Sequence, residues 1–227
     1  MKAYKTEELL GPLNEVEKKN APEFLLIAGK LEILNSRARV SVVGSRKATP
    51  QGLNRAQAFV RILVEKNIAV VSGLAEGIDT AAHQTAIEKK GRTIAVLGTP
   101  LDKCYPAKNR TLQDQIIEEH LAISQFPSSC PSHRRNFPMR NRTMALISDA
   151  TVIVEAGDKS GTIHQGWEAL RLGRPLFIME SLVKNKALAW PQEMLSYGAE
   201  PLSRENIETF FDFLPERTSG EPSSIAL

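Results

Sequence analysis

The stretch VVGSRKATPQG, residues 42–52, decides how the fold of this chain is interpreted. An apolar run ends at Gly44, and a segment with helical character follows from residue 51. A strand, a glycine turn and a helix in this order direct unpaired backbone N–H groups toward a bound anion. The stretch contains neither G-x-G-x-x-G nor G-x-x-x-x-G-K-[ST], so neither the dinucleotide fingerprint nor the P-loop accounts for it.

Strand-like and helix-like segments alternate around this stretch. The expected strands are short runs rich in Val, Ile, Ala and Leu, at 39–43, 68–72, 93–97, 121–125, 151–155 and 175–179. The expected helices are 51–66, 79–90, 110–119, 138–148, 162–172 and 203–213. Continuous apolar strands are typical of a sheet that is covered on both faces. The alternation therefore predicts an α/β fold with a doubly wound, mostly parallel sheet, an extended Rossmann-like fold.

The chain divides into three predicted parts. Residues 1–36 form an N-terminal extension that packs on the core, and their segment EFLLIAGKLEILN suggests a short strand or hairpin. Residues 37–213 form the Rossmann-like core. Residues 214–227 have the composition of a disordered tail.

Charge is nearly balanced overall, at +3, but it is unevenly distributed. Neither residues 33–64 nor residues 126–148 contain an Asp or Glu, while both are rich in cations: Arg37, Arg39, Arg46, Lys47, Arg55, Arg61, Arg134, Arg135, Arg140 and Arg142. We expect two locally positive surfaces. For either block taken alone, an ordinary solvated face is the competing interpretation.

Cysteine and histidine spacing predicts no metal site. Cys104 and Cys130 have no C-x-x-C partner, and the four histidines are scattered. We interpret the cysteines as reduced thiols of a cytoplasmic protein. No signal peptide is evident at the N-terminus, and no apolar run reaches the roughly 20 residues of a membrane span. We expect no cofactor.

Four glycine-bearing loops follow the predicted strands: GSRKATPQG, SGLAEGIDTAAH, LGTPLDKCYPAKNR and EAGDKSGT. In open α/β sheets the ligand binds beyond the carboxyl ends of the strands, so these loops meet at one edge. KSGT indicates an anion nest at a helix start, and GSRK indicates either a second one or a turn with a surface arginine. Tyr105 and Phe137 stand in cationic segments, where bases stack on aromatics while arginines hold phosphates. Burial in the core is the alternative for each ring alone.

Acidic side chains near these loops leave an enzymatic alternative open. Glu155, Asp158 and Glu168 offer acid/base chemistry, although no His–Ser or paired-carboxylate arrangement is evident. We interpret Asp79 as a helix N-cap and His83 as a packed or capping histidine.

At these loops the sequence resembles the DNA-processing protein A family, also called DprA/Smf. The motifs VSVVGSRKATPQG, VVSGLAEGIDTAAH, TIAVLGTPLDKCYPAKNR and NFPMRNR occur in the family's order, and the match runs from about Asn20 to Met179. The resemblance implies a Rossmann-like core that binds single-stranded DNA, forms a homodimer and loads a RecA-type recombinase in natural transformation or recombination. Pro100 departs from the glycine usual there, and the chain leaves no room for the further domains often found in the family.

The resemblance also implies that Arg46 and Lys103 contact phosphates, and that Arg140 and Arg142 line the same pocket. The full set of predicted DNA- or phosphate-binding residues is Gly44, Ser45, Arg46, Lys47, Ser72, Gly73, Lys103, Arg140, Asn141, Arg142, Ser160, Gly161 and Thr162. No catalytic residue is predicted.

Two other functions compete with single-stranded DNA binding. The lonely-guy phosphoribohydrolases of the same superfamily use a Gly-Gly-x-Gly-Thr loop and a nearby Glu. Gly161, Thr162 and Glu168 resemble part of that arrangement, but the double glycine is missing. The third interpretation is a sensor of a free nucleotide. We favour a single-stranded DNA-binding protein that is not an enzyme.

Overall fold

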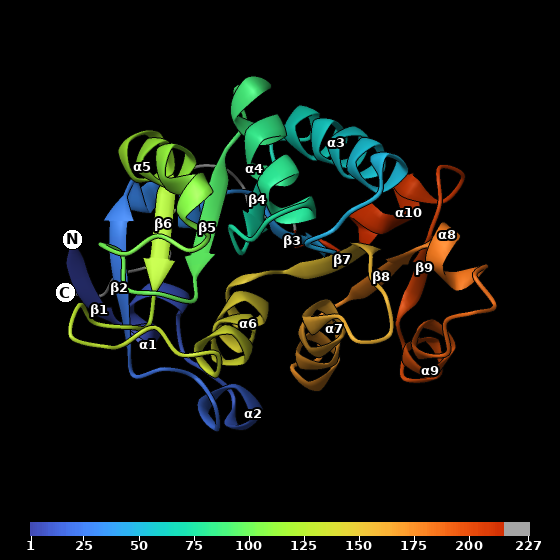
Figure 1. Ribbon diagram of the computed structural model, residues 1–227. Coiled ribbons are helices and arrows are strands. Elements are labelled where there is room, and N and C mark those ends of the chain that lie inside the picture. Colours follow the sequence, from blue (N-terminus) through green and yellow to red (C-terminus); the bar gives the residue numbers. More distant parts are fainter. Residues whose placement is uncertain (216–227) are drawn as a thin grey trace.

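Nine strands form one sheet in the computed structural model, which describes residues 1–215 (Figure 1). Their order across the sheet is β1-β2-β6-β5-β4-β3-β7-β8-β9. The strands β3 to β9 pair in parallel, whereas β1 pairs with β2 and β2 with β6 in antiparallel register. The strand bounds are β1 Lys2–Lys5, β2 Phe24–Gly29, β3 Arg39–Gly44, β4 Ala69–Ser72, β5 Thr93–Leu97, β6 Leu121–Ser124, β7 Ala150–Glu155, β8 Leu176–Met179 and β9 Glu200–Leu202.

Helices cover both faces of this sheet, with α3, α4 and α5 on one side and α6 and α7 on the other (Figure 1). The helix bounds are α1 Thr6–Leu10, α2 Glu15–Lys18, α3 Pro50–Glu65, α4 Ile78–Glu88, α5 Arg110–Glu119, α6 Asn136–Ile147, α7 Gly161–Arg171, α8 Glu180–Val183, α9 Trp190–Ser196 and α10 Ile207–Asp212. Short 3-10 helices span Leu31–Asn35 and Ala107–Asn109. The predicted doubly wound, mostly parallel α/β fold is confirmed.

The continuous apolar strands are buried on both faces. In β3 every residue is buried, and successive side chains alternate between two cores. Val42 packs with Phe59 of α3, whereas Val43 packs with Met144 of α6. Each fully buried valine contributes roughly 1.5–3 kcal/mol relative to an exposed one, so both cores fix β3 in the centre of the sheet.

Several short elements were not expected from the sequence. The strand suggested in the N-terminal segment is present as β2, but β1 was not expected, and both strands belong to the main sheet. At the opposite edge β9 has only three residues and contains Pro201, which suits an edge strand and leaves almost no sequence pattern. The C-terminal helix begins at Ile207 rather than residue 203, because Ser203 N donates to the side chain of Asn206 in a preceding turn (2.8 Å). The predicted disordered tail lies outside the described residues from residue 216 onward.

A buried ion pair joins the two central strands at their amino ends. Arg39 donates to Asp149 from its backbone nitrogen (2.8 Å) and from Nε and Nη2 (both 3.3 Å). The backbone nitrogen of Asp149 donates in return to the carbonyl of Arg39 (2.8 Å). Both side chains are at most 9% exposed, so the pair is shielded from water. Arg39 belongs to the first acid-free segment but is not part of a positive surface.

Replacing Asp149 with alanine leaves the Arg39 guanidinium buried without its carboxylate. We expect Asp149→Ala to lower the free energy of unfolding by about 3–5 kcal/mol in urea titrations. Glu208→Ala is the matched control, because it breaks the exposed pair with Lys66 (3.3 Å) and should leave the midpoint unchanged. Equal midpoints for the two variants would contradict this assignment.

Candidate functional site

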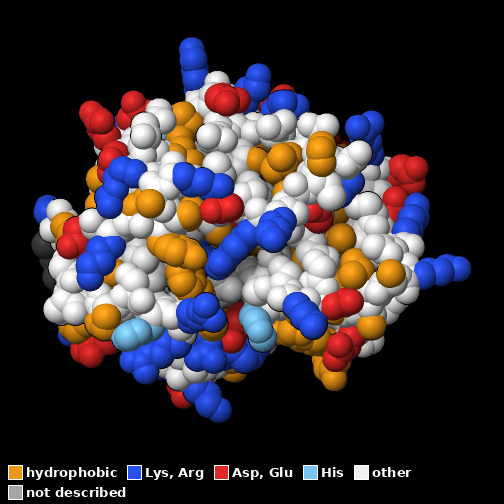
Figure 2. All heavy atoms as spheres, viewed as in Figure 1, with side chains coloured by type: hydrophobic (Ala, Val, Ile, Leu, Met, Phe, Trp, Pro, Cys, Tyr) orange, Lys and Arg blue, Asp and Glu red, His pale blue; other side chains and the backbone are white. Residues whose placement is uncertain are grey.

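A cavity of about 600 Å³ opens at the carboxyl ends of β3 and β7. Its walls are the β3–α3 loop, the β4–α4 turn, α6 and the start of α7. Figure 2 shows Lys and Arg side chains gathered around a hollow near the centre of this face. Nine of the predicted binding residues line this cavity: Gly44, Ser45, Arg46, Lys47, Arg140, Asn141, Ser160, Gly161 and Thr162.

The β3–α3 loop is held against β7 by Glu155. The carbonyl of Glu155 accepts from Ser45 N (2.7 Å), and its carboxylate accepts from Thr49 N (2.8 Å) and Thr49 Oγ1 (2.5 Å). Thr49 in turn caps α3 by accepting from Gly52 N (3.0 Å). A Cβ on Gly44 would lie 2.5 Å from Cγ1 of Ile78, so the turn requires glycine there. Glu155 is therefore engaged in shaping the loop.

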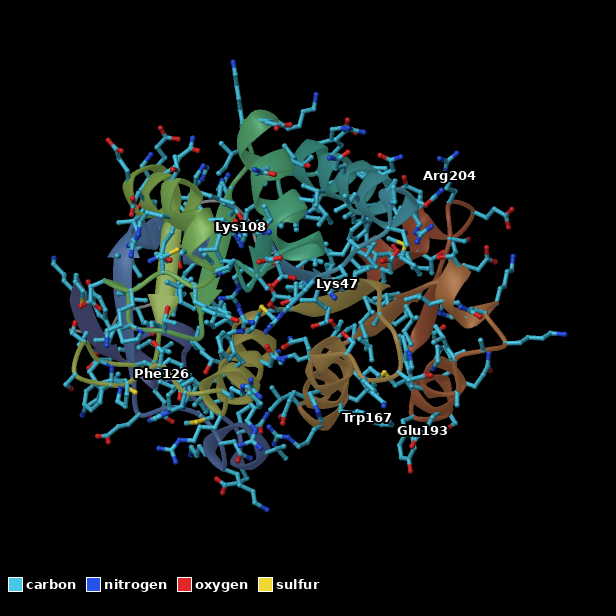
Figure 3. All side chains as sticks on the ribbon, in the orientation of Figure 1. Lys47, Lys108, Phe126, Trp167, Glu193 and Arg204 are labelled. Carbon is cyan, nitrogen blue, oxygen red and sulfur yellow. The ribbon has the colours of Figure 1, made fainter. Side chains whose placement is uncertain are left out.

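Arg46 and Lys47 project from this loop as exposed cations. Neither has an ion-pair partner in the part of the chain that the structure describes. Figure 3 shows Lys47 near the centre of the view, above α6 and α7. The Arg46 guanidinium lies 5.4 Å from the centroid of the Phe137 ring, and Phe137 lies 5.2 Å from Tyr105. A cation and two aromatic rings thus form a row beside the cavity.

The start of α7 forms the opposite wall. Ser160 is the N-cap, and its Oγ accepts from Thr162 N (3.2 Å). Gly161 has no atom within 4 Å of the position a Cβ would take, and the first turn contains no acidic residue. The helix dipole favours an anion at this end of α7, and the exposed Lys159 adds a positive charge.

Arg140 lies on the floor of the cavity and is only 5% exposed. Its Nη1 donates to the carbonyls of Gly73 and Val96 (2.8 Å for Val96), and its Nε donates to Asn141 (3.0 Å). Burial lowers the pKa of Arg140 from its ordinary value, and the nearby Asp79 opposes that shift. Arg140 therefore joins the ends of β4 and β5 as well as facing the cavity.

Asp79 does not act as the N-cap that the sequence suggested. The N-cap of α4 is Gly77, whose φ of 75° favours glycine. The Asp79 carboxylate instead accepts from Gly73 N (3.2 Å) and Ala75 N (3.3 Å), and so closes the turn before the helix. Burial raises the pKa of Asp79, while the Arg140 guanidinium lowers it by a smaller amount.

Four predicted residues lie away from the cavity wall. Arg142 pairs with Glu168 (3.0 Å), which also binds Arg171 (2.6 Å). The expectation that Arg140 and Arg142 share a pocket is corrected, because residues two apart on a helix point to different sides. Lys103 and Ser72 bond backbone carbonyls of the protein instead. Lys103 Nζ donates to the carbonyl of Cys130 (3.1 Å), and Ser72 Oγ donates to the carbonyl of Val42 (2.8 Å). Gly73 lines a small adjoining recess with Arg46, Tyr105 and Phe137.

Among the lining residues that sequence reasoning missed, His164 and Gln165 have polar side chains. The available signal was their spacing, since they follow Gly161 by three and four positions and so share its side of α7. Among residues 1–215 no group of three or more His, Cys, Asp or Glu side chains is placed to hold a metal ion. Within the same range every helix is too short or too polar to cross a bilayer.

The family model for "DNA recombination-mediator protein A" matches residues 5–215 of this chain. The chain belongs to this family. It is 30% identical to "DNA processing protein DprA" of Bacillus subtilis and 34% identical to that of Streptococcus pneumoniae, in each case over 86% of this chain. Those alignments cover 65% and 68% of the two relatives, so the chain spans about two thirds of their length.

Solved structures of the family have the same fold. The X-ray structure of DprA from Streptococcus pneumoniae superposes with a TM-score of 0.78 and 30% identity, over 92% of this chain and 73% of that one. A Helicobacter pylori DNA processing protein A, described with a single-stranded DNA binding mode, gives a TM-score of 0.78 at 25% identity. That comparison covers 94% of this chain and 98% of the Helicobacter chain.

The close contact between Gly73 and Arg140 predicts a specific defect. A Cβ at residue 73 would overlap the Arg140 guanidinium, which could move away only by giving up its bonds to the carbonyls of Gly73 and Val96. We expect Gly73→Ala to lower the free energy of unfolding by about 1–3 kcal/mol in urea titrations. Gly157→Ala is the control, because nothing lies within 4 Å of a Cβ there. An unchanged Gly73→Ala midpoint would refute the tight packing of Arg140.

His83, interpreted from sequence as packed, is fully buried and lies 2.7 Å from Thr93 Oγ1 through Nδ1. Burial lowers its pKa from 6.5 to about 3. Between these values the unfolded chain binds the proton and the folded chain does not, so stability falls as pH falls.

We therefore expect the unfolding free energy of the wild type to decrease below pH 6.5, with His83 contributing up to about 1.4 kcal/mol per pH unit. Urea unfolding at pH 7 and pH 5 measures this, and His83→Gln should reduce the difference between the two. His133→Gln changes an exposed histidine and should preserve the difference. Identical pH dependence in wild type and His83→Gln would contradict the assignment.

Proposed function

We propose that this chain binds single-stranded DNA through the cavity at the ends of β3 and β7. The observation that carries the proposal is the convergence of positive groups from separate elements on one cavity. Arg46 and Lys47 come from one loop, Lys159 and the N–H groups of α7 from another, and Arg140 from the floor. Phosphates are the ligands that such a set favours. The DNA-binding Helicobacter pylori relative supports the choice of nucleic acid.

The aromatic row beside the cavity supports a single strand over a duplex. Tyr105 is 53% exposed and stands against Phe137, which itself lies under Arg46. Unpaired bases stack on exposed rings of this kind, whereas the bases of a duplex are stacked on each other. Stacking beside a phosphate-binding wall gives affinity with little dependence on sequence.

The proposal assigns no catalysis to the cavity. Two of the three acids considered from sequence are engaged elsewhere: Glu155 holds Thr49 and Arg55, and Glu168 lies between Arg142 and Arg171. Asp158 lines the cavity on an exposed loop, and Asp79 and His164 line it as well. The Asp79 carboxylate is already engaged by the backbone N–H groups of Gly73 and Ala75. No hydrogen bond joins Asp158 to Asp79 or to His164 in the part of the chain that the structure describes, so no acid/base pair is assembled there. A bound nucleotide therefore meets cations and amides rather than a placed base.

The proposal extends to a cytoplasmic protein that acts as a homodimer and passes the strand to a RecA-type recombinase in transformation or recombination. Family membership supports these partners. Exposed apolar side chains in the C-terminal third, Tyr197 at 67% and Phe213 at 46%, offer contact area for a protein. Sedimentation of the full chain tests the dimer, and co-purification with a RecA-type recombinase tests the second partner.

Arg46→Ala tests the proposed site directly. One charged hydrogen bond to phosphate is worth roughly 1.5–3 kcal/mol, so we expect affinity for a thymidine oligonucleotide to fall about tenfold or more. Fluorescence anisotropy at several salt concentrations should also show a log–log slope about 0.7 shallower than that of the wild type. Arg61→Ala is the control, since Arg61 is exposed on α3 and does not line the cavity. Unchanged affinity in Arg46→Ala with a normal melting curve would refute the site.

A further inference from the structure

Gln165 is an unpartnered polar group on the wall of the cavity. Its side chain is 1% exposed, and it lies among the residues that line the space. Both amide atoms, Nε2 and Oε1, are buried without a hydrogen-bond partner in the part of the chain that the structure describes.

A buried amide without partners is unfavourable, since it has lost its hydrogen bonds to water and gained none from protein. The neighbouring lining residues Val43 and Met144 are apolar and offer it nothing. A primary amide presents a donor and an acceptor side by side, and the edge of a nucleobase presents the complementary pair. Glutamine bonds adenine in this bidentate way, through the exocyclic amine and the adjacent ring nitrogen.

The position of Gln165 on α7 connects it to the anion site. Gln165 follows Gly161 by four residues and Thr162 by three, so all three lie on one side of the helix. One helical turn, about 5.4 Å, separates the N-terminal amides from Gln165 along the axis. A nucleotide whose phosphate binds at the start of α7 therefore directs its base along the helix toward the amide.

We propose that Gln165 reads the edge of one nucleobase, with adenine preferred, in a nucleotide whose phosphate is held by Ser160, Gly161 and Thr162. This inference rests on the proposed nucleotide-binding function of the cavity, and it adds base recognition to a site otherwise built for phosphates. The nucleotide comes either from a DNA strand or from solution, and the same contacts serve both.

Binding of thymidine oligonucleotides that carry one central adenine, cytosine or abasic nucleotide tests the inference by fluorescence anisotropy. We expect the wild type to bind the adenine oligonucleotide about tenfold more tightly than the abasic one. Gln165→Met keeps the length and apolar stem of the side chain but removes both polar atoms, and should bind the two equally. Gln115→Met is the matched control, because Gln115 is a partly exposed residue of α5 that donates to Glu119 (3.0 Å) and does not line the cavity. It should retain the preference.

A calorimetric titration with AMP distinguishes the two sources of the nucleotide. AMP binding that is lost in Gln165→Met, together with no binding of any oligonucleotide, supports the base contact and refutes the single-stranded DNA function. Equal binding of the adenine and abasic oligonucleotides by the wild type refutes the base contact. If Arg46→Ala then binds both oligonucleotides more weakly than the wild type does, the proposed DNA-binding function is still supported.

Thermal melting of the free protein separates base reading from a structural role of Gln165. Because the amide has no partner in the free protein, Gln165→Met should melt at the same temperature as the wild type or higher. A lower melting temperature with unchanged preference for adenine would overturn the inference. If Gln165→Met melts at a lower temperature and has lost the preference, Gln165→Leu is measured as a second variant. Loss of the preference in a Gln165→Leu protein that melts at the wild-type temperature supports base reading. Retention of the preference in Gln165→Leu refutes it.

Discussion

The proposed binding edge of this protein depends on one carboxylate, that of Glu155 at the end of β7. It accepts two hydrogen bonds from Thr49 and one from Arg55 (3.4 Å), while its carbonyl accepts from Ser45. These bonds tie the β3–α3 loop to the neighbouring strand and fix where α3 begins. Without them the backbone N–H groups of Ser45 and Thr49 would lose their acceptors, and the direction of Arg46 would be less well defined. The Glu155 carboxylate, which bonds the loop, thus positions the cations Arg46 and Lys47 at the cavity.

Around the cavity, most acidic side chains are bonded within the protein while several basic ones remain exposed. Glu168 is enclosed by Arg142 and Arg171, and Asp79 accepts backbone N–H groups beneath the β4–α4 turn. Acids near the cavity are mostly satisfied by the protein, whereas Arg46 and the start of α7 remain available. Charges of one sign left unpaired around a concave surface reinforce each other's field. The net charge of +3 does not reveal this, because it averages over paired and unpaired groups.

The fold was predictable because its central strands and helices carry strong patterns: six apolar strands and six helices lie close to their expected places. The convergence of the GSRK and KSGT loops was predictable for the same reason, since parallel strands bring their carboxyl ends together. What could not be predicted was how individual long side chains divide their bonds. Arg140 and Arg142 are indistinguishable in sequence, yet one lies under the cavity and the other pairs with Glu168. Edge strands such as β9 were missed because a segment of three residues is too short to show a periodic pattern of apolar residues.

Arg140 explains why the floor of the cavity is polar even though it is buried. A guanidinium at 5% exposure needs several acceptors, and Gly73, Val96 and Asn141 supply them. Those acceptors lie at the ends of β4 and β5 and on α6, so satisfying the cation also fixes the separation of these elements. A floor assembled in this way cannot collapse onto an apolar core, because collapse would strip the cation of its partners. The cavity is therefore already formed in the free protein, as the proposed binding of a nucleotide requires.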